Sequence, residues 1–174
     1  MNAARTPRSS ALKAREAATA PARAAGKARQ ALIYSFLDVY RAEPMARVEI
    51  IKHGLPADYI DELARQMAMP KERLLRGLGL SPATVNRKVR DAKPLSTEES
   101  ERALGMARLV GQVQAMVEES GSPKGFNAAE WVATWLQEPL AALGGRRPAE
   151  LMDTSEGQAI VSNLLARMQS GAYA

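Results

Sequence analysis

The chain has 174 residues, enough for one domain or two small ones, and 46% of them are hydrophobic. It contains no cysteine, which excludes disulfides and thiolate chemistry and fits a reducing compartment, so we expect a cytoplasmic location. No stretch approaches the roughly 18 apolar residues of a membrane span, and no secretory signal is recognisable. Helix-forming residues dominate without polar–apolar alternation, which predicts an all-α protein.

The net charge of +5 lies in the first 30 residues, which hold seven Lys and Arg against one acid. Residues 31–174 carry 17 basic and 18 acidic side chains. Residues 1–30 are rich in alanine and contain one leucine and no aromatic residue, so they are predicted to be a disordered basic tail. Such a tail either adds nonspecific phosphate contacts or only aids solubility. A third interpretation is an organellar transit peptide.

Residues 31–69 are expected to form short helices. The first is expected to bury a stripe of residues four apart: Leu32, Phe36 and Tyr40. Pro44 ends it, and the segment 45–52 follows before a break at His53-Gly54. Pro56 is expected to open the next helix, because a proline at the first helical position loses no hydrogen bond. Its expected buried face is Ile60, Leu63, Ala64 and Met67.

Residues 70–90 contain the spacing Leu75-x2-Leu78-Gly79-x-Ser81-x2-Thr84-x2-Arg87. A helix-turn-helix needs leucines to pack its first helix, a glycine at the turn and a hydroxyl that caps the second helix. Small and polar residues at the start of that helix then face the major groove. On this interpretation Ser81 and Arg90 meet phosphates, and the residues facing base edges are Ala83, Thr84, Asn86 and Arg87. The alternative is an αα-corner whose polar residues are solvated.

Ser96 and Glu99 are spaced as a capping box at the start of the longest predicted helix, which extends to about Glu119. Its apolar stripe is broad enough to need partners on two sides and consists of Ala103, Ala107, Leu109, Val110, Val113, Met116 and Val117. Glu98 and Arg102 are spaced for an i,i+4 ion pair.

The C-terminal region follows a loop over 121–125. Asn127 is expected to cap a helix that carries Trp131 and Trp135, both expected in the core. After a Gly144-Gly145 turn and a short helix from Pro148, Thr154 is expected to cap the last helix. The expected buried stripe of that helix is Ile160, Val161, Leu164, Leu165 and Met168. Gly171 is expected to end it, which leaves Ala172, Tyr173 and Ala174 as a free tip.

This region carries one long motif: Trp135-x3-Pro139-x3-Leu143-Gly144-Gly145-x2-Pro148-x2-Leu151-x2-Thr154-x2-Gly157-x3-Val161-x3-Leu165-x-Arg167-x3-Gly171. The motif resembles the toxin-binding domain of the Xre/MbcA/ParS antitoxin family, over 95–174 and, through the helix-turn-helix segment, from about residue 70. The resemblance implies a type II antitoxin. It would neutralise a RES-type toxin, which consumes NAD or transfers ADP-ribose from it, and repress its own operon.

The predicted organisation is therefore a basic tail (1–30), a helix-turn-helix DNA-binding and dimerisation region (31–93) and a helical toxin-binding domain (94–174). The implied partners are a toxin encoded nearby, operator DNA and a second copy of the chain, without any cofactor. The candidate toxin-binding residues are Arg146, Arg147, Gly171, Ala172, Tyr173 and Ala174. Tyrosine is favoured at interfaces, and the tip is thin enough to enter a toxin's cleft.

An enzyme is not expected. His53 is the only histidine, no zinc-ligand spacing exists, and no glycine-rich phosphate loop is present. We therefore predict neither catalytic nor metal-binding residues. The alternative to an antitoxin is a stand-alone helix-turn-helix transcription regulator. That interpretation leaves the C-terminal motif unexplained.

Overall fold

A computed structural model describes residues 33, 35–121 and 124–170, and its regular elements are all helical. Residues 35–174 form one unit, to which the following description refers. In chain order its elements are α2 (Phe36–Arg41), α3 (Pro44–His53), α4 (Tyr59–Gln66), α5 (Lys71–Gly77), α6 (Pro82–Arg90), α7 (Thr97–Glu119), α8 (Ala128–Trp135), the 3-10 helices η1 (Ala141–Leu143) and η2 (Pro148–Leu151), and α9 (Ser155–Gln169). Within the described residues, no helix combines the length and apolarity that a bilayer crossing requires.

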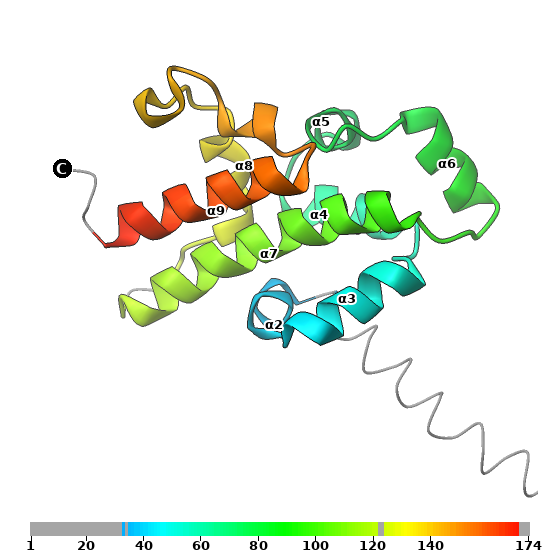
Figure 1. Cartoon of the computed structure of the whole chain (residues 1–174), viewed down its shortest axis with the longest axis horizontal. Coiled ribbons are helices and arrows are strands. Elements are labelled where there is room, and N and C mark those ends of the chain that lie inside the picture. The colour runs from blue at the N-terminus through cyan, green and yellow to red at the C-terminus, as the bar shows by residue number, and fades with distance from the viewer. Residues whose placement is uncertain (1–32, 34, 122–123, 171–174) are drawn as a thin grey trace, which may run out of the picture. The chain divides into compact units, whose positions relative to one another are not determined.

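Helix α7 is the central element, with α2 and α3 on one side and α8 and α9 on the other (Figure 1). The predicted capping box starts it: the Glu99 N–H donates to Ser96 Oγ, and the Ser96 N–H donates to the Glu99 carboxylate at 2.7 Å. Most of its predicted stripe is buried, while Met116 and Val117 are half-buried. Because apolar side chains cover more than one face of α7, the helix can hold both halves of the fold together.

Close packing of α2 against α7 depends on a glycine. A Cβ atom at Gly111 would lie 2.0 Å from the carbonyl oxygen of Phe36, so any residue other than glycine would clash with α2 at this position. The predicted stripe of α2 is wrong in part: Val39 is buried, whereas Tyr40 is 39% exposed and Phe36 is half-buried. Leu32, the third residue of that stripe, lies outside the described residues. Helix α2 packs its backbone on Gly111 with Val39 facing the core, which leaves Tyr40 largely at the surface.

Helix α4 begins later than its sequence suggested. Pro56 does not open it; instead Pro56 pairs with Pro94 in an isolated bridge, and α4 starts at Tyr59. The Leu55 backbone N–H donates to buried Ser100 Oγ at 2.9 Å, and the Leu95 N–H donates to the Leu55 carbonyl at 2.8 Å. These contacts join the segment before α4 to the start of α7. The predicted buried face of α4 is confirmed.

Buried amides fix α9 on α7. The Gln112 amide donates to the Ser162 carbonyl at 3.0 Å and accepts from the Ser162 hydroxyl at 2.7 Å. The Gln158 amide donates to the carbonyls of Arg102 and Met152 at 3.1 and 2.9 Å. Such satisfied buried amides permit only one register between the two helices. Thr154 caps α9 as predicted.

Candidate functional site

The structure forms the predicted helix-turn-helix from α5 and α6. Leu74, Leu75 and Leu78 are buried, and Gly79 makes the turn with a φ of +62°. The Thr84 N–H donates to Ser81 Oγ at 3.4 Å, and Pro82 occupies the first turn of α6. Five of the six proposed DNA-contacting residues are exposed and the sixth, Thr84, is half-buried; the set is Ser81, Ala83, Thr84, Asn86, Arg87 and Arg90. Val85 alone is fully buried on α6, and Val89 is half-buried.

Helix α7 holds this motif through two polar side chains. The Lys88 ammonium forms an ion pair with the Glu99 carboxylate. Burial raises the pKa of the Glu99 carboxyl, but hydrogen bonds from Lys88 and from Ser96 outweigh burial, so its pKa is lowered. The Arg102 guanidinium donates to the carbonyls of Leu78 and Gly79 at 3.4 and 3.2 Å. Lys88 and Arg102 therefore position the turn and the second helix of the motif.

The expected ion pair between Glu98 and Arg102 is wrong, because the backbone carbonyls of the turn take the Arg102 guanidinium instead. Sequence spacing reveals only neighbours on the same helix. Leu78 and Gly79 are more than 20 residues away, so no local pattern could have identified this contact.

Charge distinguishes this motif from its surroundings. Residues 71–93 contain seven Lys and Arg against two acids, whereas residues 97–119 contain five acids against two arginines. Arg90 lies 3.2 Å from Asp91, and Arg87 forms no ion pair with any described residue. A basic, polar and exposed helix after a tight turn is suited to phosphates and base edges.

A second exposed surface lies on the C-terminal region. Gly144 and Gly145, with φ of +64° and +82°, form the turn after η1, and the Leu140 N–H donates to the Arg146 carbonyl at 3.1 Å. Arg146 and Arg147 are exposed on this turn. A shallow cleft of about 400 Å³ separates it from α9; its lining is Ala142, Leu143, Ile160, Asn163, Leu164 and Arg167.

The predicted buried stripe of α9 is wrong at two positions: Ile160 is 44% exposed and Met168 is 39% exposed. Val161, Leu164 and Leu165 are buried as expected. The hydrogen bonds of the Gln112 and Gln158 amides fix which side of α9 faces inward, and that side excludes Ile160 and Met168. We call these two residues, with the half-buried Leu143 of η1 that lines the same cleft as Ile160, the apolar patch of α9. The proposed tip residues Gly171, Ala172, Tyr173 and Ala174 lie outside the described residues, as does the tail 1–30.

The tryptophans of α8 were both expected in the core, and only Trp135 is buried. Trp131 is half-buried and stacks on Trp135 with ring centroids 5.7 Å apart and planes 11° apart. Phe126 contacts Trp131 at 6.2 Å between centroids. Trp131 therefore connects the buried ring of Trp135 with the exposed ring of Phe126.

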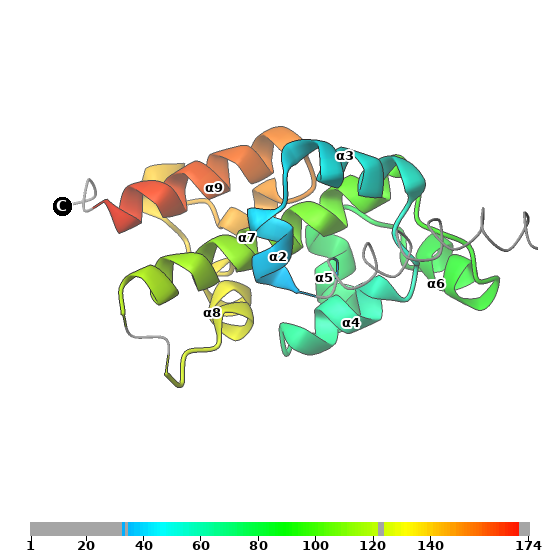
Figure 2. The same cartoon turned by 90° about the horizontal axis from the view of Figure 1, so that it is seen from below.

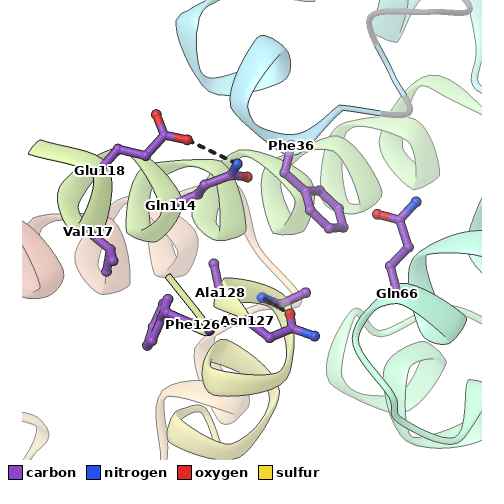
Figure 3. Close-up of a pocket in the computed structure, with 10 residues that line it drawn as sticks. Phe36, Gln66, Gln114, Val117, Glu118, Phe126, Asn127 and Ala128 are labelled. Atoms are coloured by element: carbon purple, nitrogen blue, oxygen red, sulfur yellow. Dashed lines mark hydrogen bonds between the residues drawn. The ribbon is translucent and has the colours of Figure 1, made fainter. Parts of the chain in front are cut away.

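A further cleft, of about 540 Å³, lies between α2, α7 and the start of α8 (Figure 3). Phe36 and Gln66 border it on one side, opposite Phe126 and Asn127. Its only charged lining residue is Glu118, which accepts from Gln114 at 3.3 Å and pairs with Arg41 at 3.2 Å. Its described lining thus offers neither a histidine nor an unpaired acid for general acid–base work.

A basic, exposed helix-turn-helix followed by a helical region with an exposed apolar patch is typical of proteins that bind DNA and a protein partner. Residues 46–108 match the antitoxin Xre-like helix-turn-helix domain, and residues 114–171 match the antitoxin Xre/MbcA/ParS C-terminal toxin-binding domain. The first match ends inside α7 and the second begins there, so this helix contributes to both regions.

The chain is 46% identical to the Prs ADP-ribosylating antitoxin of Sphingobium sp. (strain YBL2) over 159 residues, which is 91% of this chain and 99% of the relative. It is 32% identical over 126 residues to the antitoxin Xre of Yersinia enterocolitica, covering 72% of this chain and 80% of that one. The antitoxin Xre of Photorhabdus laumondii is 26% identical over 122 residues, covering 70% and 77%.

The chain belongs to the Xre/MbcA/ParS antitoxin family. It is the antitoxin of a type II toxin–antitoxin system and combines a helix-turn-helix domain with a toxin-binding domain, so it acts by binding and not as an enzyme.

Proposed function

We propose that this antitoxin neutralises a RES-type toxin that consumes NAD or transfers ADP-ribose, and that it represses its own operon through α6. The observation that supports this class of toxin is the similarity, over 91% of the chain, to the Sphingobium protein, whose name specifies an ADP-ribosylating system. The proposed organisation remains a tail over 1–30, a DNA-binding and dimerisation region over 31–93 and a toxin-binding domain over 94–174. We place the complex in the cytoplasm, where operator DNA and NAD are both found.

The proposed toxin interface is the apolar patch of α9 together with Arg146 and Arg147. Exposed apolar side chains rimmed by polar ones are typical of protein interfaces. The patch lies within the matched toxin-binding domain, which indicates the toxin as its partner. We further propose that residues 171–174 enter the toxin's cleft, where Tyr173 fills apolar space.

Co-expression with the toxin from the neighbouring reading frame tests this function. The wild-type antitoxin should restore growth, co-purify with the toxin and stop NAD consumption. Ile160→Asp should abolish co-purification, whereas Ala92→Asp, which introduces the same charge at an exposed residue between α6 and α7, should preserve it. A chain ending at Ser170 should still associate while the toxin regains NAD consumption. Full inhibition by the truncated chain would exclude entry of the tip into the cleft.

We also propose that the antitoxin is a dimer when it reads its operator, since helix-turn-helix proteins commonly bind two half-sites. The second copy would cover the exposed apolar residues of α2 and α3, namely Tyr40, Met45 and Val48. Met45→Asp should then give a monomer in analytical ultracentrifugation and weaken operator binding. A stable dimer of this variant would place the dimer contact elsewhere.

A further inference from the structure

Three arginines from two parts of the chain converge on one groove. Arg73 and Arg76 extend from α5, the first helix of the helix-turn-helix, and Arg147 precedes η2. They line a groove of about 640 Å³ together with Gly77, Gln137, Ala149 and Glu150. Two arginines thus belong to the matched helix-turn-helix domain and one to the matched toxin-binding domain.

The charge of this groove is not neutralised within the described chain. None of the three arginines forms an ion pair with a described residue. The one acid in the lining, Glu150, accepts a hydrogen bond from the Arg147 backbone N–H at 3.3 Å. All three arginines are exposed, so a partner can reach them.

We propose that this groove binds an acidic segment of the toxin, which thereby contacts both the toxin-binding domain and the scaffold helix α5. Guanidinium groups bind carboxylates with paired, charge-assisted hydrogen bonds, and a groove lined by three of them favours a segment carrying several carboxylates. The inference rests on the proposed toxin binding and extends it to α5.

The position of the groove favours a protein partner over DNA. In Figures 1 and 2, α8 and η2 lie on the side of α5 opposite α6. In a helix-turn-helix the second helix enters the major groove, so a duplex docked on α6 would approach α5 from the side of α6. The toxin-binding domain, by contrast, supplies one wall of the groove, including Gln137 and Arg147.

The test compares two double variants with the same change of charge. Arg73→Glu/Arg76→Glu alters the groove, and Lys52→Glu/Arg65→Glu alters exposed residues on α3 and α4. Affinity for the purified toxin is measured at 50 and 300 mM salt, and operator affinity is measured in parallel. We expect the groove variant to bind toxin about ten-fold more weakly at low salt and to lose most of the salt dependence. The control variant should match the wild type, and circular dichroism should show both folded.

Equal toxin affinity of the groove variant and the wild type would overturn the inference and leave toxin binding itself established. Loss of operator affinity with unchanged toxin affinity would also overturn it and would make the groove a DNA-backbone contact. If both double variants weakened toxin binding equally, the loss would follow from the change in net charge, and the groove would not be a toxin-binding site. If the wild type did not bind the toxin at all, the proposed function would fail together with the inference.

Discussion

Helices α6 and α9 both present an exposed face, but the two faces differ in chemistry and in support. Only Val85 is fully buried on α6, and its exposed face combines the polar or basic Asn86, Arg87 and Arg90 with the small apolar residues Pro82 and Ala83. Helix α9 buries Val161, Leu164 and Leu165 and still exposes Ile160 and Met168. A polar face on a lightly packed helix suits DNA, whose charge dominates binding. An apolar face on a rigid support suits a protein partner, because burial of apolar area supplies much of the binding free energy of a protein–protein complex.

The largest expected effect tests the rigid support of α9. A Cβ atom at Gly157 would lie 1.9 Å from the Leu151 carbonyl oxygen, so Gly157→Ala must displace backbone and should lower the free energy of unfolding by about 3 kcal/mol. At Gly77 on α5, a Cβ would meet nothing within 4 Å. Gly77→Ala should therefore raise stability by about 0.5–1 kcal/mol. Urea denaturation measures both, and a mild Gly157→Ala effect would mean that α9 is loosely held.

Local sequence predicts contacts between adjacent residues, but it does not predict contacts between distant segments. Caps and turns depend on adjacent residues, which is why those at Ser81, Ser96 and Thr154 were predictable. The close approach at Gly111 depends on the Phe36 carbonyl of a distant segment and left no local pattern, whereas the approach at Gly157 involves Leu151, which lies in the same motif. Dependence on distant segments also explains why the exposure of Ile160 was missed. Helical spacing identifies an apolar stripe, but only tertiary packing decides how much of it is covered.

The second prediction concerns the polar face. Arg87→Ala should weaken binding to the cognate operator by about 1–3 kcal/mol and relax specificity at one base pair, because bidentate arginine contacts discriminate guanine. Arg90→Ala should weaken binding to all sequences to a similar extent, as expected for a phosphate contact. Gel-shift titrations at fixed salt, with operator and mutated operators, measure both. Unchanged operator affinity of the Arg87 variant would remove this residue from the base-reading set.

A smaller effect is expected where the two regions meet. Arg102→Met keeps the aliphatic stem but removes the hydrogen bonds to the carbonyls of Leu78 and Gly79, so stability should fall by about 1 kcal/mol. Operator affinity should fall more than toxin affinity, because the turn before α6 loses its support. Arg108→Met is the control: Arg108 is half-buried on the same helix and makes no hydrogen bond to a described residue. Equal effects of both variants would assign the loss to packing alone.

The smallest effect concerns the ion pair that supports α6. The pKa of Glu99 is lowered from 4.5 in the folded chain, so its carboxylate contributes stability above the unfolded pKa, and this contribution is lost as the pH falls through the folded pKa. Because the Lys88 and Glu99 side chains are 18% and 16% exposed, the pair is partly screened, and we expect less than about 1 kcal/mol. Glu99→Gln should therefore narrow the stability difference between pH 7 and pH 3, as measured by urea denaturation. Lys88→Met should narrow it less, because the Ser96 N–H still stabilises the carboxylate in that variant. Identical pH profiles for Glu99→Gln and the wild type would show that the pair does not support α6, whose orientation would then depend on Val85 and on the turn held by Arg102.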